Sequence, residues 1–464
     1  MSDVSDLVAA AQHAPVVVIG GGIGGLVAAY ECAKVGMPVT LLEVSDRLGG
    51  SVRTVDVGGV RADAGAVSFA ADGVVDKLID ALGLAELGLD GARAAQQATA
   101  RSTTSARGLV PLPDGVLGIP ANPFLSDAVR VIGWGGAWRG YLDRLRPPLT
   151  IGHENRLGAL VRKRMGAKIE QRLVAPVTRG SLGLTPDEVD VSVASPELNP
   201  ALTRQGSLSG AVAEILGDAS ARPRLTLAHG METLVTALER RIAELGGRVL
   251  RETTAESIVR TGDTYVVTAR RIVDDPEGPE GDAAVPEEFT AAVIVVAAGE
   301  HAARALLHGL VELPAEFSAP SRLTTLTAIV DAEPTWGAGV YPQPADSDIV
   351  SIDDLTAQWG VGVGAGVRIV RARLTGVHTL PDATAQLEGV LGVSVHDAVI
   401  ADFDAAPHRE QRGFGAAAAR LRDANLWPAG LGATGAWLVG TGLDLVVADA
   451  QNTAERLRRG ALFS

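Results

Sequence analysis

Three glycines and one acidic residue near the start of the chain have the spacing of a nucleotide-binding turn. Gly20, Gly22 and Gly25 form a GxGxxG pattern, and Glu43 follows after one further apolar run. In this pattern the first glycine permits a tight turn, the second lets the backbone approach a pyrophosphate, and the third lets a helix pack closely on a strand. A carboxylate at Glu43 can accept hydrogen bonds from both ribose hydroxyls and would repel a 2′-phosphate. The spacing predicts an adenine dinucleotide other than NADP, with an accidental βαβ crossover as the alternative.

The residues around these positions predict the elements that hold them. The apolar run Val16–Ile19 stops at the glycines, a helix of small residues is expected over 23–35, and the apolar run Val39–Leu42 ends at Glu43. In such a βαβ unit the helix N-terminus, with its free N–H groups, faces the phosphates.

Two segments after Glu43 extend this pattern. SDRLGGSVRT and RADAGAVSF supply further small and charged residues, namely Arg47, Gly49, Gly50, Ser51, Arg53, Asp63, Gly65 and Ser68. An NAD domain would proceed directly into its next βα unit, whereas these residues suit a longer, extended ligand. This double signature resembles the FAD-binding flavin amine oxidase superfamily, and an ordinary glycine-bearing loop is the alternative.

Composition excludes several classes of protein. The chain has 464 residues, 47% of them apolar and 21% charged, which predicts two or three globular domains. The net charge of −14 argues against a nucleic-acid partner. Cys32 is the single cysteine, so disulfides, thiolate metal sites and a cysteinyl–flavin bond near the C-terminus are excluded, and FAD would be non-covalent. The histidines are scattered, with His301 and His308 expected on an exposed helix, so no metal site is predicted.

The N-terminal segment MSDVSDLVAAAQHAP is acidic and lacks the basic region of a secretory signal. No uncharged run of about 20 apolar residues is available to span a bilayer. We therefore expect a cytoplasmic protein, with peripheral membrane attachment as the alternative. A basic run on a predicted amphipathic helix is expected to be a solvated face, or else a contact with a membrane edge or an anionic substrate; its members are Arg162, Lys163, Arg164 and Lys168.

Nucleotide-fold patterns recur at the start, middle and end of the chain. They predict an α/β protein with a discontinuous Rossmann-like FAD-binding domain, an antiparallel-sheet substrate domain and a helical subdomain. A helix is expected over 74–90 and an acidic hairpin tip over 274–288. The predicted boundaries are 1–70, 222–305 and 425–464 for the FAD-binding domain, 71–110 and 306–424 for the substrate-binding domain, and 111–221 for the helical subdomain.

Four later segments resemble a narrower family. They are RLGALVRKRMGAKIEQRLVAPVTRGSLG, GLVPLPDGVLGIP, GSLSGAV and GAWLVGTGLDLVVADAQNTA. Together they are similar to the oxygen-dependent protoporphyrinogen and coproporphyrinogen oxidases, over nearly the whole chain. Gly440 and Gly442 match the family's last glycine turn. Four positions depart from its pattern and imply an altered flavin-ring environment: Leu443-Asp444 for Ile-Pro, Asp449-Ala450 for Ser-Gly, Ser181-Leu182 for Val-Tyr, and Phe403 where tryptophan is frequent.

The resemblance implies an enzyme in which FAD does the chemistry. A porphyrinogen would lose hydride from a meso carbon to flavin N5, and O₂ would reoxidise the flavin to yield peroxide. The helix that starts near Leu443 would direct its N-terminus at the flavin pyrimidine edge. No catalytic side chain is predicted. The predicted cofactor-binding residues are Gly20, Gly22, Ile23, Gly24, Gly25, Glu43, Val44, Arg47, Gly50, Ser51, Gly65, Ala66, Val67, Ser68, Ala255, Gly440, Thr441, Gly442 and Leu443.

Arginines are the candidates for pairing with propionates, each with a structural ion pair as the alternative. The first choices are Arg107, Arg139, Arg179 and Arg371, followed by Arg144, Arg146 and Arg368. The composition is rich in arginine and poor in lysine, which resembles high-GC Gram-positive proteins, where the coproporphyrin route is the family's usual setting. Coproporphyrinogen III is therefore favoured over protoporphyrinogen IX.

Three other functions stay open. An amine oxidase of the same superfamily usually places a lysine near flavin N5 and two aromatics before the ring, but every lysine here precedes residue 169 and Trp437 is the one evident aromatic candidate. A carotenoid-type desaturase is the second. The third is a non-catalytic flavin- or porphyrin-binding protein that contacts other haem-pathway enzymes.

Overall fold

A five-stranded parallel sheet gathers strands from distant parts of the chain. The computed structural model describes residues 10–106, 108–146, 154–218, 223–274, 282–313, 322–334, 336–345, 347–423 and 426–463. The strand order is β12 (Arg248–Leu250), β2 (Val39–Leu42), β1 (Val16–Ile19), β16 (Val293–Val296) and β22 (Leu431–Ala433), and every neighbouring pair is parallel. These strands are short and almost wholly apolar, as expected where both faces of a parallel sheet are buried.

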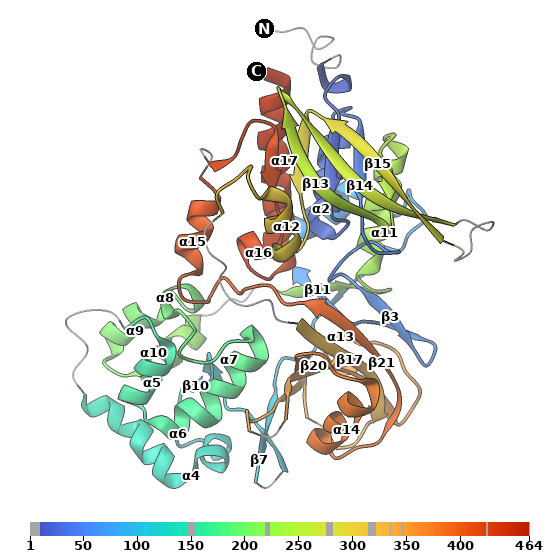
Figure 1. Cartoon of the computed structure of the whole chain (residues 1–464). Coiled ribbons are helices and arrows are strands. Elements are labelled where there is room, and N and C mark those ends of the chain that lie inside the picture. Colours follow the sequence, from blue (N-terminus) through green and yellow to red (C-terminus); the bar gives the residue numbers. More distant parts are fainter. Residues whose placement is uncertain are drawn as a thin grey trace.

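Helices and a smaller sheet cover this parallel sheet. α17 (Leu443–Phe463) packs along α2 (Ile23–Ala33), and α11 (Glu232–Glu244) packs on α2 as well. Figure 1 shows this group in one half of the molecule, together with an antiparallel sheet that contacts β1 and β16. Its strands are β13 (Thr253–Thr261), β14 (Thr264–Asp274) and β15 (Asp282–Ala291).

The other half of the molecule contains a seven-stranded sheet. Its order is β21 (Val395–Asp404), β17 (Arg322–Asp331), β20 (Val367–Thr375), β19 (Ile349–Asp354), β18 (Gly339–Tyr341), β7 (Ser102–Ser105) and β8 (Gly108–Pro111). Successive residues of a strand point to opposite faces. One face is apolar and packs against α14 (Leu380–Leu391) through residues that include Leu326, Val370, Ala372, Leu374 and Leu387. The opposite face carries charged and hydroxyl side chains.

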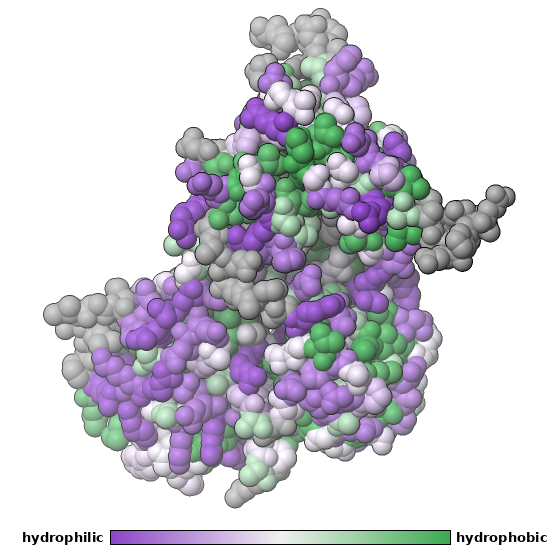
Figure 2. All heavy atoms as spheres, viewed as in Figure 1, coloured by the Kyte–Doolittle hydropathy of each residue, from purple (hydrophilic) through white to green (hydrophobic). Residues whose placement is uncertain are grey.

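Helices between residues 126 and 218 build a third region beside this sheet (Figure 1). Leu157, Leu160, Val161 and Met165, which recur at helical spacing, are all buried in its core. The longer helices are α4 (Ser126–Tyr141), α5 (Leu157–Arg164), α7 (Ala175–Leu182), α9 (Leu198–Gln205) and α10 (Leu208–Asp218). On the face of the molecule in Figure 2, hydrophilic residues cover much of this region.

The expectation of a solvated basic face over α5 and α6 (Ala167–Ile169) is wrong for one of its four residues. Arg164 is buried and its Nε lies 2.5 Å from Asp143 Oδ1. Arg162 pairs with Asp187 at 2.7 Å and with Glu170 at 3.2 Å. Lys163 and Lys168 are exposed, as expected. Acids that are distant in the sequence neutralise Arg162 and Arg164, which no local pattern reveals.

Several boundaries differ from the sequence-based expectations. The first helix ends at Ala33, and α3 (Val74–Leu82) stops at Gly83 where a helix was expected to 90. The α3 side chains pack into the core of the parallel sheet, so residues 74–82 do not belong with the seven-stranded sheet. The hairpin of β3 (Thr54–Val57) and β4 (Val60–Asp63) does pack on that sheet. Residues 282–288, expected in a hairpin tip, continue β15, and 275–281 lie outside the described residues.

The other elements are shorter connections. They are β5 (Phe69–Ala70), β6 (Arg93–Ala95), β9 (Gly115–Val116), β10 (Ile119–Pro120), η1 (Leu142–Leu145), α6 (Ala167–Ile169), η2 (Glu170–Val174), α8 (Val191–Ala194), β11 (Arg224–Leu227), α12 (Glu300–Leu307), α13 (Leu355–Trp359), α15 (Phe414–Leu421) and α16 (Ala436–Val439). None of the described helices is both long and apolar enough for a bilayer span.

Candidate functional site

The turn between β1 and α2 has the geometry that its glycines predict. Gly20 has φ of +109°, which favours glycine over other residues. A Cβ on Gly25 would overlap the Gly20 carbonyl oxygen, so helix and strand pack at backbone distance. A Cβ on Gly22 would meet nothing within 4 Å. The turn is therefore closed on its inner side and open where a pyrophosphate would approach.

Glu43 lies at the carboxyl end of β2 and faces this turn. Its Oε2 accepts the Gly21 N–H at 2.5 Å, and its Oε1 accepts the Ser45 N–H at 2.9 Å and the Ser45 hydroxyl at 2.6 Å. The Glu43 carbonyl accepts the Thr253 N–H at 2.8 Å, which brings the start of β13, with the predicted residue Ala255, to the same edge. Val44 is 64% exposed beside it.

The segment 47–53 packs beside the turn. The Gly49 N–H donates to the Gly21 carbonyl at 2.8 Å, and a Cβ on Gly50 would lie 3.3 Å from Gly22 Cα. Burial, followed by the charge of Arg47, lowers the pKa of Arg53. Neither arginine forms an ion pair with a residue that the structure describes. Two like charges beside an open glycine turn suit an anionic group such as a pyrophosphate.

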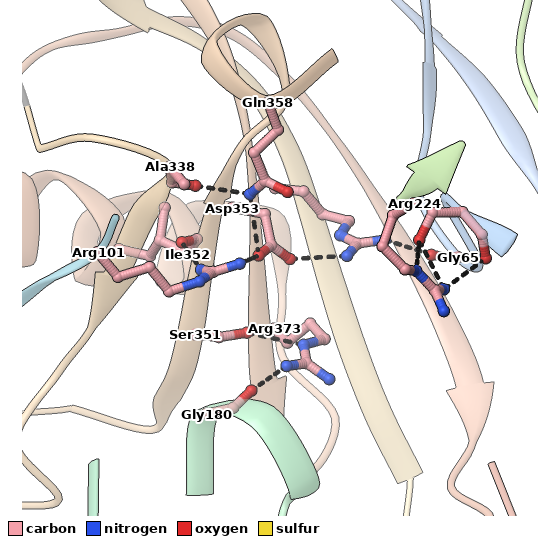
Figure 3. Close-up of polar contacts among 12 residues, drawn as sticks. Gly65, Arg101, Gly180, Arg224, Ala338, Ser351, Ile352, Asp353, Gln358 and Arg373 are labelled. Carbon is pink, nitrogen blue, oxygen red and sulfur yellow. Dashed lines mark hydrogen bonds and ion pairs between the residues drawn. The ribbon is translucent and has the colours of Figure 1, made fainter. Parts of the chain in front are cut away.

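The segment 65–68 continues the same surface. The Ala66 N–H donates to the Ser51 carbonyl at 2.9 Å, and a Cβ on Gly65 would overlap that carbonyl. Arg371 from the seven-stranded sheet donates to the Gly65 carbonyl. Arg224 donates to the Ser68 carbonyl and hydroxyl, both at 2.9 Å. Figure 3 shows Arg224 beside Gly65, with its hydrogen bonds as dashed lines.

The last glycine turn closes the site. Gly440 has φ of +88°, and its Cβ would lie 2.8 Å from the Arg409 N atom. A Cβ on Gly24 would lie 3.2 Å from Val446, so the first turns of α2 and α17 are neighbours. We call residues 20–25, 43–51, 65–68 and 440–443 the cofactor cradle. The structure brings these predicted segments together.

One departure from the family pattern has a structural explanation. Asp444, which stands where proline is usual, accepts the Ala70 N–H at 3.1 Å and the Val75 N–H at 3.4 Å. The N-cap of α3, Gly73, has no side chain to do this. Asp444 therefore links the beginning of α17 to the beginning of α3.

The polar face of the seven-stranded sheet adjoins segment 65–68. We call Arg101, Arg371, Arg373 and Asp353 the arginine cluster (Figure 3). Asp353 pairs through one oxygen with Arg101 at 2.6 Å and through the other with Arg371 at 2.7 Å. Arg373 donates to Ser351 Oγ at 2.7 Å and to the Gly180 carbonyl of α7. The guanidinium of Arg101 also lies over the Tyr341 ring, 4.6 Å from its centroid.

Charge in this cluster is unbalanced. Burial opposes ionisation of Asp353, but the arginines outweigh it and hold the pKa of that carboxyl well below its usual range. Burial lowers the pKa of Arg373, against the opposing effect of Asp353. The buried Nε of Arg371 has no hydrogen-bond partner among the described residues. Arg101 and Arg371 thus share one carboxylate, and Arg373 forms no ion pair with a described residue, which leaves capacity for an anion.

A cavity of ≈ 520 Å³ lies beside the cradle. Val67 lines it, together with residues of β4, β11 and α13 that include Asp63, Thr226 and Trp359. Burial raises the pKa of Asp63 to about 6, although the Thr54 hydroxyl and the Met231 N–H donate to it.

Comparison with known proteins identifies the family. The family model described as flavin containing amine oxidoreductase matches residues 23–328. The chain belongs to that family. Membership confirms the predicted cofactor, FAD, and the predicted class of enzyme, an oxidoreductase.

Several curated relatives are named porphyrinogen oxidases, and a hydroxyneurosporene desaturase of Rhodobacter capsulatus also matches, 44% identical over 68 residues. Coproporphyrinogen III oxidase of Propionibacterium freudenreichii is 32% identical over 193 residues, 40% of this chain and 35% of the relative. The enzyme of the same name from Bacillus subtilis is 27% identical over 274 residues, 54% of this chain and 55% of the relative. The matches thus span about half or less of the relatives' lengths. A candidate protoporphyrinogen oxidase of an Exiguobacterium species has the same fold, with a TM-score of 0.79, 22% identity and coverage of 96% and 98%.

The predicted substrate arginines of this family member have different surroundings. Arg371 belongs to the arginine cluster. Arg139 donates to the carbonyls of Arg164 and Lys163, and Arg146 also donates to Lys163, so both have structural roles. Arg144 lies over the Tyr141 ring, and Arg368 pairs with Asp354 at 2.9 Å. Arg179 lies on α7 without an ion pair to a described residue, and Arg107 lies outside the described residues.

The prediction missed Arg101 and Arg373. The sequence could have indicated Arg373, because it lies two residues from Arg371 in the strand pattern RIVRARLT and so points to the same face of the sheet. No sequence pattern indicates Arg101, since only the pairing of β7 with β18 brings it to Asp353. Among the described residues no group of three or more metal-ligating side chains occurs. Trp437, the candidate for an aromatic cage, is 3% exposed within the core of the parallel sheet.

Proposed function

We propose that this protein oxidises a porphyrinogen to the porphyrin in haem biosynthesis, with coproporphyrinogen III as the favoured substrate and O₂ as the electron acceptor. The arginine cluster carries the proposal, because a ligand with several carboxylates would supply the negative charge that Asp353 alone leaves missing. The names of the relatives support the same reaction class.

Each part of the site has a task in this reaction. Bound FAD supplies the two-electron acceptor for hydride from a meso carbon. Arg373 and Arg101 would hold propionates, while Arg371 fixes segment 65–68 through the Gly65 carbonyl. One side chain thereby couples the substrate face of the sheet to the cradle. The chain's own residues bind and orient the substrate and exclude water.

Coproporphyrinogen carries four propionates and protoporphyrinogen two. A site with three guanidinium groups and one internal counter-charge suits the more anionic substrate. It suits an apolar carotenoid poorly, and the burial of Trp437 removes the evident aromatic wall of an amine oxidase site.

The direct test mixes the FAD-loaded protein with each porphyrinogen in air and follows porphyrin fluorescence and peroxide. The expected result is faster turnover of coproporphyrinogen III than of protoporphyrinogen IX, both above spontaneous autoxidation. Rates equal to autoxidation, with porphyrin still bound, would indicate a non-catalytic carrier. Flavin bleaching by amines would indicate an amine oxidase.

A charge variant tests the anchoring role. Arg373→Met removes one cation of the cluster, and we expect coproporphyrin III binding to weaken about 10- to 100-fold, the range of a charged hydrogen bond. The control is Arg270→Met, since Arg270 pairs with Glu256 on the surface of β14. Equal affinities of the two variants would contradict the proposal.

We further propose that this protein is cytoplasmic and that it docks peripherally on anionic membranes through α4. Trp134 and Trp138 are 66% and 57% exposed, and Leu145 is 78% exposed. Phe124 joins them, with its ring centroid 5.1 Å from that of Trp138. Two of the four lysines, Lys163 and Lys168, lie on the same region although the chain is acidic overall. Exposed tryptophan beside cations suits a membrane interface.

Flotation with vesicles of phosphatidylcholine and phosphatidylglycerol tests this docking. We expect binding that salt weakens and that the double change Trp134→Ser and Trp138→Ser abolishes. Val259→Ser, on an exposed strand of the other half of the molecule, is the control. Binding that survives the double change would contradict the proposed surface.

A further inference from the structure

The segment between β21 and α15 lies where the three regions of the molecule meet. The Pro407 carbonyl accepts the Thr441 N–H of the cradle at 3.0 Å. The Glu410 carbonyl accepts the Asp190 N–H of the helical region at 2.8 Å. His408 and Arg409 lie between these anchors, so the His408 ring is held at the junction.

The His408 imidazole is fixed by the cradle. Its Nδ1 lies 2.7 Å from Thr441 Oγ1, and its side chain is 22% exposed. At the end of α7 a Cβ on Gly183 would still lie 3.9 Å from His408 Nε2, so a glycine leaves this nitrogen unobstructed there. With Thr441 Oγ1 accepting from Nδ1–H, the lone pair stays on Nε2.

Three charged groups surround this ring: Arg373, Glu410 and Arg409, whose Nε lies 3.8 Å from Glu410 Oε1. Arg373, which donates to the Gly180 carbonyl of the same helix, belongs to the arginine cluster on β20. Glu410 lies on the segment itself, with Oε2 4.0 Å from Nδ1. Burial, followed by the charge of Arg373, lowers the pKa of His408 to about 4. The ring is therefore neutral near pH 7 and can accept a proton.

We propose that His408 is the proton acceptor of the substrate site, an inference that rests on the proposed porphyrinogen oxidation. When a hydride leaves a meso carbon for the bound flavin, a pyrrole N–H bond must also break. Its electron pair stays on nitrogen and forms a C=N bond, and its proton passes to His408 Nε2. Glu410 stabilises the imidazolium until the proton reaches solvent.

Substrate binding prepares this base. A propionate that pairs with Arg373 cancels the charge that disfavours protonation of His408, so the pKa of His408 should rise toward its ordinary value. The base is thus weak in the empty site and stronger when substrate is present. The propionate that anchors the macrocycle on Arg373 thus also makes His408 a stronger base.

Proton uptake on ligand binding tests this coupling without turnover. Calorimetry of coproporphyrin III binding to the FAD-loaded protein at about pH 5.3, in two buffers of different ionisation enthalpy, counts the protons. Wild type should take up more protons than His408→Gln, because a propionate on Arg373 cancels its opposing charge and raises the pKa of His408 from about 4, while burial still holds that pKa below its ordinary value. His396→Gln is the matched control, since His396 is exposed and pairs with Asp331.

Anaerobic flavin bleaching by coproporphyrinogen III supplies the second readout. His408→Gln should slow bleaching by about 100-fold at neutral pH, the scale of general base catalysis, while coproporphyrin affinity and FAD content stay within about threefold. Thr441→Val should slow it less, and Thr441→Ser should restore it, because serine retains the hydroxyl that orients the ring.

The two proposals fail in different ways. If wild type does not bind coproporphyrin III, the proposed substrate is wrong and the role of His408 falls with it. If it binds but His408→Gln neither changes proton uptake nor slows bleaching, porphyrinogen oxidation stands and His408 is not the acceptor. If His408→Gln loses FAD and the control variant does not, His408 has a structural role in the cradle.

Discussion

The cofactor cradle and the arginine cluster meet at Gly65 but are specified by different physical properties. The cradle is built from backbone, and its close contacts exist because Gly25 and Gly65 lack a Cβ. The arginine cluster is built from side chains, and its distinctive property is an excess of positive charge around Asp353. The cradle should therefore respond to changes of volume, and the cluster to changes of charge.

The largest expected effect comes from adding volume to the cradle. Gly25→Ala places a methyl group on the Gly20 carbonyl, so α2 must move away from β1. We expect FAD affinity to fall by about 100-fold or more, with a lower Tm, from the cost of overpacking. The 450 nm to 280 nm absorbance ratio measures it. Gly135→Ala, where a Cβ meets open space on α4, is the control, and equal FAD content in both would refute the steric account.

A change of charge without volume tests the cluster. Asp353→Asn leaves Arg101 and Arg371 without their buried counter-charge, so the free energy of unfolding should fall by about 3–5 kcal/mol. Urea denaturation measures this. Saturating coproporphyrin III should stabilise the variant more than wild type, because its carboxylates replace the missing charge. A loss below about 1 kcal/mol would show that the cluster is not electrostatically constrained.

Asp63 lies between the two regions and gives a pH-dependent test. Its pKa of about 6 exceeds the ordinary value of 3.8, so the native state holds a proton that the unfolded state has lost between these values. Stability should therefore fall as pH rises from about 4 to 6, by roughly 3 kcal/mol. Asp63→Asn should remove this fall in urea titrations, whereas Asp263→Asn, in an exposed turn, should leave it. An unchanged pH profile in Asp63→Asn would exclude this residue as the cause.

The smallest effect is expected at the link between α17 and α3. Asp444→Ala deletes the acceptor for the Ala70 and Val75 N–H groups and should cost about 1 kcal/mol, as for a lost helix cap. Asp444→Asn keeps an acceptor and should cost less. Thermal unfolding followed by circular dichroism ranks the two, and the reverse order would show that the charge of Asp444 matters more than its hydrogen bonds.

The difference between the two regions also explains what sequence reasoning found. The family and its FAD cofactor were predicted correctly, because turns such as the one containing Gly20 and Gly25 repeat a local spacing. The residue contacts to FAD stay a prediction. Arg101 was not among the predicted residues, and the substrate role of Arg139 stays a prediction, because an arginine's partner depends on register and packing between distant elements. The pairing of Asp353 with Arg371 follows from the β19–β20 register, which is absent from local pattern. The burial of Arg164 against Asp143 has the same origin.

The order of strands in the parallel sheet bears on synthesis. β22 and α17 complete the sheet and the last turn of the cradle, yet they follow more than four hundred residues of chain. The ribosome must therefore synthesise residues 431–463 before α17 can pack beside the first glycine turn. FAD, which cells make from riboflavin, should therefore bind only after residues 431–463 have been synthesised. In cells short of riboflavin, the protein should accumulate as full-length, colourless polypeptide and not as nascent chains that carry the cofactor.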